Sequence, residues 1–299
     1  MATGDPISGT KAALGLGDHR QRTLAIRRLR RHKAAVAGGC VLLISVISAV
    51  LAPQIAPYDP VAMDLSGALS PPSPAHLLGT DSFGRDILSR IIFGARVSLL
   101  IGITSVGWAA LVGVPLGLVA GYFGGVIGNL LMRIVDALLS FPPILLAIAV
   151  SASMGGGQRT VVFALGLMYV PVFARLMRGS TLSLREEVFV MAAQSYGAPP
   201  PLIILRHILP NMVGIIVVQA TIGFSSAIIS EATLSFLGVG VPPPLPSWGR
   251  DLSDARGYLR DAWWLLVVPA TTIVANVLGI NFLGDGLRDA LDPRMRTRE

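Results

Sequence analysis

Six apolar windows without Asp, Glu, Lys or Arg constrain the fold of this chain more than any other feature. A transmembrane helix needs about 20 predominantly apolar residues, and all but the fourth window reach that length. The fourth helix must run past Arg175, whose long side chain can reach the membrane interface. We therefore predict an all-α membrane protein with six transmembrane helices, within Ala34–Tyr58, Val97–Met132, Ala137–Gln158, Thr160–Ala174, Ile208–Ser230 and Ala262–Gly284.

The composition agrees with a membrane protein, because 53% of the 299 residues are hydrophobic and only 14% are charged. Lys and Arg are enriched on the cytoplasmic side of membrane proteins. With both termini inside, 17 of the 24 basic residues are cytoplasmic: eight before Ala34, Arg133, four from Arg175 to Arg206, and four at the C terminus. The net charge of +7 is therefore a topology signal, and we expect no nucleic-acid partner.

The order of these segments predicts four regions. Residues 1–33 form a cytoplasmic tail, and its basic run Arg27–Lys33 precedes an apolar stretch too long for a signal peptide. Residues 34–95 hold the first helix and an external segment, where prolines oppose a long helix until Asp86–Ala95. Residues 96–290 form a core of five helices, and 291–299 a cytoplasmic tail. Cys40 is the only cysteine, which excludes an intrachain disulfide.

Residues 185–210 form the longest predicted cytoplasmic loop. Val188, Phe189, Ala192, Ala193 and Tyr196 fall on one face of a short helix that Gly197 and three prolines end. A second helical piece over residues 202–208 is predicted to stop at Pro210. A charged, turn-broken segment between apolar runs predicts a docking site for a soluble partner.

This loop resembles the EAA loop of ABC-importer permeases, whose pattern is Glu-Ala-Ala, three residues, Gly, and a later Leu-Pro. Ala192, Ala193, Gly197, Leu209 and Pro210 keep the spacing, but Met191 stands where the pattern has Glu. Glu187 lies one turn earlier on the same face and is a candidate replacement for that carboxylate.

Four further blocks resemble the C-type inner-membrane permeases of dipeptide, oligopeptide and nickel ABC importers. They are HLLGTDSFGRDILSRIIFGARVSLLIG, MRIVDALLSFPPILLAIAV, SEATLSFLGVGVPPPLPSWG and LGDGLRDALDPR. The resemblance implies a type I ABC-importer permease fold in the bacterial cytoplasmic membrane. It also implies a cytoplasmic coupling loop that docks on an ATPase, with Glu187, Val188, Phe189, Met191, Ala192, Ala193, Tyr196, Gly197, His207 and Pro210 as its residues.

The same resemblance implies a multi-subunit importer. The expected partners are a B-type permease, two ABC ATPase subunits that bind ATP and Mg, and an external solute-binding protein docked on 58–95 and 239–261. Trp248 is a candidate for that docking surface, with simple loop packing as its alternative. Transport would proceed by alternating access. The expected substrate is a di- or oligopeptide, with nickel, glutathione or an oligosaccharide as alternatives.

Two acidic residues lie within predicted spans, where ionisable groups are costly. Asp136 is expected to form a structural i,i+3 pair with Arg133. Glu231 follows 23 uncharged or apolar residues in the fifth helix, and is expected to contact either the translocation path or a buried partner helix. If both were proton-coupling groups, the chain would instead be a stand-alone secondary transporter; a membrane scaffold is the third alternative.

Motifs for catalysis are missing from the sequence. The four histidines have no metal-ligand spacing, and no GxSxG or GxxxxGK[ST] pattern occurs. We therefore predict a non-enzymatic subunit with no catalytic residue, metal site or cofactor of its own. Gly155–Gly157 is expected to be a tight turn between the third and fourth helices rather than a phosphate loop.

Overall fold

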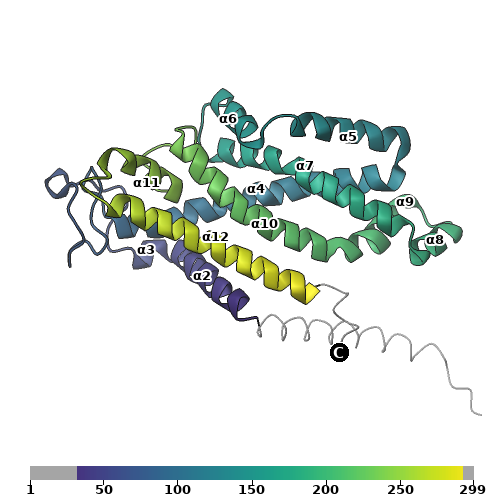
Figure 1. Ribbon diagram of the computed structural model, residues 1–299, viewed down its shortest axis with the longest axis horizontal. Coiled ribbons are helices and arrows are strands. Elements are labelled where there is room, and N and C mark those ends of the chain that lie inside the picture. The colour runs from purple at the N-terminus through teal and green to yellow at the C-terminus, as the bar shows by residue number, and fades with distance from the viewer. Residues whose placement is uncertain (1–31, 292–299) are drawn as a thin grey trace, which may run out of the picture.

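The computed structural model describes residues 32–291, and the regular elements in this part of the chain are all helices, apart from one isolated bridge between Thr80 and Asp86 (Figure 1). The expected tails at 1–33 and 291–299 therefore lie almost entirely outside the described residues. The long helices are α2 (Lys33–Val50), α4 (Ile87–Phe123), α7 (Gln158–Arg185), α10 (Leu209–Phe236) and α12 (Trp264–Leu291). The shorter elements are α3 (Ala52–Ile55), η1 (Leu65–Gly67), α5 (Gly125–Leu139), α6 (Pro143–Ser153), α8 (Val188–Ser195), α9 (Pro200–Ile203), η2 (Ile204–Ile208), α11 (Trp248–Asp254) and η3 (Ala255–Tyr258).

The long helices lie side by side along the length of the molecule (Figure 1). One end carries α11 and the other carries α8 and α9, and we call these the α11 end and the α8 end. Within residues 32–291, five helical segments are long and apolar enough to cross a membrane, and the pair α5–α6 makes a sixth if it counts as one bent span. The six-helix expectation holds with that bent span included.

The second and third spans differ from the predicted windows Val97–Met132 and Ala137–Gln158. The window Val97–Met132 is divided at Gly124 and Gly125, whose φ angles of +60° and +51° are left-handed and end α4. The following span is bent by 84° between α5 and α6. Pro142 and Pro143 at the bend cannot donate backbone hydrogen bonds to continue α5. The predicted windows were defined only by the absence of charged residues, and that criterion does not indicate where a helix ends or bends.

The external segment before α4 follows its prediction more closely. The helix expected over Asp86–Ala95 forms, and the Asp86 carboxylate caps it by accepting a bond from the Ser89 amide at 2.8 Å. The helix does not stop at the membrane boundary but continues to Phe123. One 37-residue helix therefore joins the α11 end to the membrane core.

Close backbone contact holds α4 against α7. A Cβ atom at Gly117 of α4 would lie 2.4 Å from the carbonyl oxygen of Ala174 on α7, so only glycine fits there. Gly113 and Gly121 repeat this contact one turn away on either side. Small residues let transmembrane helices approach closely enough for extensive van der Waals contact. The α4–α7 pair is therefore an interlocked unit.

Helix α2 packs on α12 through a similar crossing, which gives a testable contrast between adjacent glycines. A Cβ at Gly38 would lie 2.2 Å from the Gly279 carbonyl oxygen, whereas one at Gly39 would meet only the end of Leu283 at 3.8 Å. We expect Gly38→Ala to destabilise the protein by about 1–3 kcal/mol, the usual cost of overpacking. Thermal unfolding in detergent should show Gly39→Ala near wild type, and equal melting temperatures for both variants would contradict this crossing.

Candidate functional site: the α8 segment and the α11 cap

The segment of residues 186–208, which we call the α8 segment, forms a projection at the α8 end (Figure 1). Its apolar side chains divide into two groups. Val190, Ile203 and Ile208 are fully buried and belong to the main core, so they fix the segment to the helix bundle. Val188 and Tyr196 are 75% and 92% exposed. The segment is therefore rigidly attached on one face and presents apolar side chains on the other.

Helix α8 ends as its sequence predicts. Gly197 has a left-handed φ of +75°, and its amide donates to the Gln194 carbonyl at 2.9 Å. The exposed residues Val188, Ala192 and Tyr196 are spaced i, i+4 and i+8, which places them on one face. Phe189 and Met191 are also exposed beside this face, and Ala193 is half-buried.

The second helical piece does not stop at Pro210, contrary to the expectation. It runs as α9, then the π-helical turn η2, and continues directly into α10. Pro210 occupies the first turn of α10, where a missing amide proton is tolerated. The half-buried His207 lies in η2, and its carbonyl accepts a bond from Asn211 Nδ2 at 2.6 Å. The α8 segment is thus joined to α10 without a flexible break.

Glu187, the candidate replacement for the missing motif carboxylate, directly precedes α8. Its side chain is exposed and makes no capping hydrogen bond with the helix. The Met191 amide donates to the Glu187 carbonyl at 3.1 Å, so the two residues are one turn apart. The Glu187 carboxylate is available to a partner at this face, and its role stays a prediction.

The opposite end of the molecule carries a compact group of buried charges, which we call the α11 cap. It joins residues 58–90 to α11 and the start of α12. Arg90 donates from Nε to Asp251 Oδ1 at 2.8 Å and from Nη1 to the Pro60 carbonyl at 3.1 Å, and its Nη2 also contacts Asp251. Arg85 Nε donates to Asp81 Oδ2 at 2.5 Å. His76 Nδ1 lies 3.0 Å from Asp86 Oδ1.

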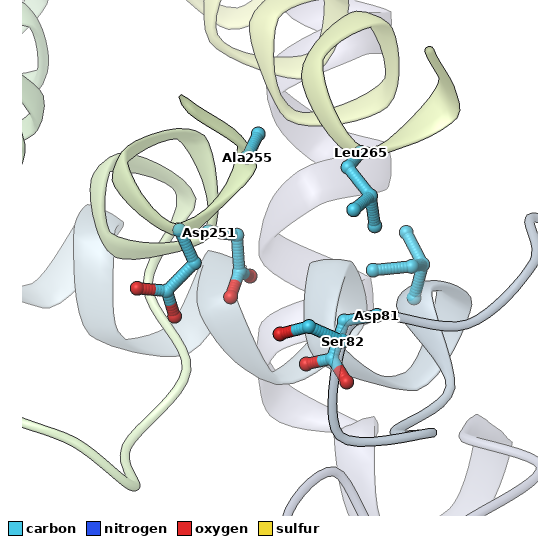
Figure 2. Close-up of a pocket in the computed structure, with 7 residues that line it drawn as sticks. Asp81, Ser82, Asp251, Ala255 and Leu265 are labelled. Atoms are coloured by element: carbon cyan, nitrogen blue, oxygen red, sulfur yellow. The ribbon is translucent and has the colours of Figure 1, made fainter. Parts of the chain in front are cut away.

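A small cavity lies inside the cap, and Figure 2 shows Asp251 and Ala255 on one helix facing Asp81 and Ser82 across it, with Leu265 on a neighbouring helix. Burial raises the pKa of the Asp251 carboxyl, an effect that the neighbouring Arg90 guanidinium opposes. The second oxygen, Oδ2, is buried and has no hydrogen-bond partner within residues 32–291. The Arg90 guanidinium therefore compensates the buried negative charge of Asp251.

Trp248, expected on an external docking surface, is instead part of the cap interior. It is 1% exposed, and its Nε1 donates to the Ile91 carbonyl at 3.1 Å. The loop-packing alternative is the correct one. The contact of Trp248 with Ile91 could not be predicted from a local sequence pattern, because the two residues are 157 positions apart.

Glu231 is fully buried, so it does not line an open path within this chain. Its carboxylate accepts hydrogen bonds from Ser98 at 3.1 Å, Ser235 at 2.9 Å and Ser247 at 3.0 Å. Each of these hydroxyls in turn accepts a backbone amide, donated by Trp248, Val241 and Arg250 respectively. The cluster ties α4 and α10 to the N-terminus of α11. Of the two roles expected for Glu231, the structure favours the buried interhelical contact.

This cluster predicts different outcomes for two substitutions. Glu231→Gln keeps one carbonyl oxygen and should cost about 1 kcal/mol, whereas Glu231→Leu leaves three buried hydroxyls without their acceptor and should cost about 3 kcal/mol or more. Complex yield and thermal unfolding measure the difference. Uptake that is altered in Glu231→Gln at wild-type yield would place this residue on the path instead.

Asp136 pairs with a different helix from the one expected. Arg175 Nη2 on α7 donates to Asp136 Oδ1 at 2.7 Å, with both side chains about 60% exposed. The i,i+3 pair with Arg133 is therefore wrong, because the arginine one helix away reaches the carboxylate instead. An ion pair this exposed contributes about 0–1 kcal/mol.

Within residues 32–291, no group of three His, Cys, Asp or Glu side chains is arranged to hold a metal ion. The Gly155–Gly157 segment is a turn between α6 and α7, as predicted.

Comparison with known proteins places these features in one family. Residues 113–297 match the family of binding-protein-dependent transport system inner membrane components, and residues 21–72 match the N-terminal TM domain of oligopeptide transport permease C. The dipeptide transport system permease protein DppC of Alkalihalophilus pseudofirmus is 44% identical over 91% of this chain and 90% of that protein.

Two further comparisons extend this similarity. The glutathione transport system permease protein GsiD of Pectobacterium atrosepticum is 46% identical over 91% of this chain and 90% of its own length. A chain of the MetNI methionine ABC transporter, solved in inward-facing conformations, superposes with a TM-score of 0.57 over 68% of this chain and 96% of that one, at 21% identity. This likeness shows the type I ABC-importer permease fold.

Proposed function

Because the chain belongs to the family of binding-protein-dependent transport system inner membrane components, as a permease subunit of an ABC importer, we propose that it couples ATP hydrolysis on partner subunits to peptide import. Alternating access is the proposed mechanism. In it, closure of two ATPase subunits moves the α8 segment, and the pore shifts between inward and outward opening.

The observation that carries this proposal is the construction of the α8 segment. Its buried face is continuous with the core through Val190 and Ile208, and its exposed face carries Val188 and Tyr196. A displacement applied to the exposed face is transmitted to α10, because η2 continues into α10 without a break. Such a rigid lever is what conversion of ATPase motion into pore motion requires.

The proposed substrate is a di- or oligopeptide. Relatives at 43–46% identity are named as dipeptide, di/tripeptide and glutathione permeases, all of which carry short peptides or a peptide derivative. A nickel ion or an oligosaccharide is less consistent with these names.

The proposed assembly follows from the same family. A B-type permease would form the other half of the pore, and two ATPase subunits would bind ATP and Mg at the α8 end. A solute-binding protein would dock at the α11 end, outside the bacterial inner membrane. Both termini would be cytoplasmic, since this topology places 17 of the 24 basic residues of the sequence inside. This chain would hold no cofactor and catalyse no reaction.

The stand-alone proton-coupled transporter is disfavoured by the environments of its two candidate carboxylates. Glu231 is completely buried among serine hydroxyls, and Asp136 is paired with Arg175 at the surface. A proton-coupling group needs a route to water on both sides of the membrane in turn. Neither carboxylate has that arrangement here.

Co-purification tests the proposal. An affinity tag on this chain, expressed with its neighbouring reading frames, should recover a second permease and P-loop ATPase chains in detergent. A tagged chain that purifies alone, and transports alone under a proton gradient, would contradict the proposal.

A further inference from the structure

Helix α10 carries a row of uncharged polar side chains along one face. Gln219, Ser226 and Ser230 are spaced i, i+7 and i+11, which at 3.6 residues per turn places them within a sector of about 40°. All three are partly exposed. Gln219 lies at the centre of the charge-free window Ile208–Ser230, so the row extends from the middle of this span toward the α11 end (Figure 1). We call these three residues the α10 row.

The polar groups of the α10 row are open to whatever covers this face. Ser230 Oγ lies 3.2 Å from Tyr169 Oη of α7, whose ring is buried in the main core. Within residues 32–291, the polar atoms of Gln219 and Ser226 make no hydrogen bond, and they are not buried either. The neighbouring Thr221 differs, because its hydroxyl donates to the Val218 carbonyl at 2.8 Å. The row therefore offers hydrogen bonds outward from the helix bundle.

Lipid is an unsuitable cover for such groups. Exposed hydroxyls elsewhere in the spans are satisfied by their own helix, since Thr104 Oγ1 donates to the Leu100 carbonyl at 2.6 Å and Thr271 Oγ1 to the Val267 carbonyl at 2.7 Å. The Gln219 amide has two N–H donors and an acceptor. Backbone amides that could serve this acceptor are already engaged in the helix. Polar side chains at membrane depth face a water-filled cavity or a partner.

The connection of α10 to the α8 segment favours a water-filled path over a permanent subunit contact. The turn η2 continues into α10, so a displacement of the α8 segment also displaces the α10 row. A path wall changes its surroundings when partner subunits move, whereas a permanent contact between subunits keeps them. The row is therefore placed where motion of the lever would change what it touches.

The chemistry of the α10 row fits the backbone of a peptide. Side-chain amides and hydroxyls both donate and accept hydrogen bonds, as the N–H and C=O groups of a peptide bond require. The row has no charge and no His, Cys, Asp or Glu, so it offers none of the usual nickel ligands. From Gln219 to Ser230 it extends about 16 Å along the helix, the length of about five extended residues. Such a row can bind short peptides whatever their side chains are.

We propose that the α10 row faces the translocation path and binds the backbone of the peptide as it passes. Tyr169 positions Ser230, and Gln219 exchanges hydrogen bonds with the peptide near the middle of the membrane. Each such bond replaces one to water and contributes little net free energy. The peptide is therefore held weakly enough to leave. This inference rests on the proposed function, because it names the substrate contact of the same importer.

Cysteine accessibility tests whether the α10 row faces water. Cys40→Ala gives a cysteine-free parent chain. Gln219→Cys and Ser226→Cys are the test variants, and Thr104→Cys is the matched control, because the native Thr104 hydroxyl is exposed but satisfied by its own helix. Each importer complex is placed in lipid nanodiscs, where both membrane faces are open, and treated with a hydrophilic methanethiosulfonate. The mass of this chain measures the rate of modification.

The row cysteines should react at least about tenfold faster than Thr104→Cys, because the reactive thiolate is suppressed in apolar surroundings. In proteoliposomes, modification of the row should block ATP-dependent uptake, and reduction should restore it. Equal rates at the row and at position 104 would mean that lipid or a packed partner helix covers the row, and would overturn the inference. Rapid modification with normal uptake would also overturn it. A cysteine-free parent that assembles but shows no ATP-dependent uptake would instead overturn the proposed function.

A second measurement tests the contact with the peptide backbone. Gln219→Leu should lower uptake of a labelled dipeptide about 2- to 10-fold, the effect of one lost hydrogen bond. A dipeptide analogue with an ester in place of the peptide bond has no N–H to donate, so the same substitution should change its uptake less. Both substrates are supplied at saturation of the binding protein. Equal losses for the two substrates would show that Gln219 does not bind the peptide bond.

Discussion

Replacing Val188 and Tyr196 together by aspartate is expected to abolish ATP-dependent uptake while leaving the chain folded in the membrane. Both side chains are largely exposed, so the isolated subunit loses little packing. On a bound ATPase, two charged groups would replace two apolar anchors. The loss of two such anchors costs about 3 kcal/mol or more of binding free energy, which is at least about a hundredfold in affinity. Uptake and recovery of the ATPase on the tagged permease measure the effect.

Gln194→Asp is the control for that double variant. Gln194 is exposed on the same helix but lies outside the series Val188, Ala192, Tyr196. It adds charge to α8 without removing an apolar contact, and we expect uptake and ATPase recovery near wild type. Full uptake in the double variant would show that the α8 segment is not the coupling site.

Replacing Arg90 by methionine should cause the largest loss of stability among single substitutions in the α11 cap. Methionine preserves much of the packing volume but leaves the buried carboxylate of Asp251 without its partner. Removal of one partner from a buried ion pair costs about 3–5 kcal/mol. Thermal unfolding of the purified complex should show this destabilisation.

Two comparisons separate the Arg90 effect from general damage to the cap. Asp251→Asn in the Arg90→Met background removes the unpaired charge and should recover part of the stability. Arg250→Met breaks a pair with Asp254 in which both side chains remain about one quarter exposed, so its cost should be about 1 kcal/mol or less. Equal losses of stability for Arg90→Met and Arg250→Met would contradict the claim that burial of the ion pair determines the cost.

The sequence predicts the features of this chain that depend on local signals. Missing charge marks the membrane spans, and the prolines after α8, together with Gly197, mark the end of that helix. The helix predicted to begin at Asp86 also begins there, as α4. Each of these signals acts within a few residues of the structure that it determines.

The remaining features depend on partners far away in the chain. Arg90 and Asp251 are 161 positions apart, and Ser98 and Glu231 are 133 apart, so no spacing rule could pair them. The Asp136 error has the same origin, because the local partner Arg133 competes with Arg175 across an interhelical contact. The helix continues through Pro210, contrary to the prediction, because Pro210 lies in the first turn of α10, directly after η2, where proline is tolerated.

ATP-driven uptake in proteoliposomes tests the central claim most directly. The co-purified complex is reconstituted with the solute-binding protein outside, a labelled dipeptide outside, and ATP with Mg inside. The account predicts uptake that requires both ATP and the binding protein. The Val188→Asp, Tyr196→Asp variant should lose this uptake when it is reconstituted in the same lipids and at the same protein level as the wild type. Uptake by this chain alone, driven by a proton gradient and unaffected by ATP, would contradict it.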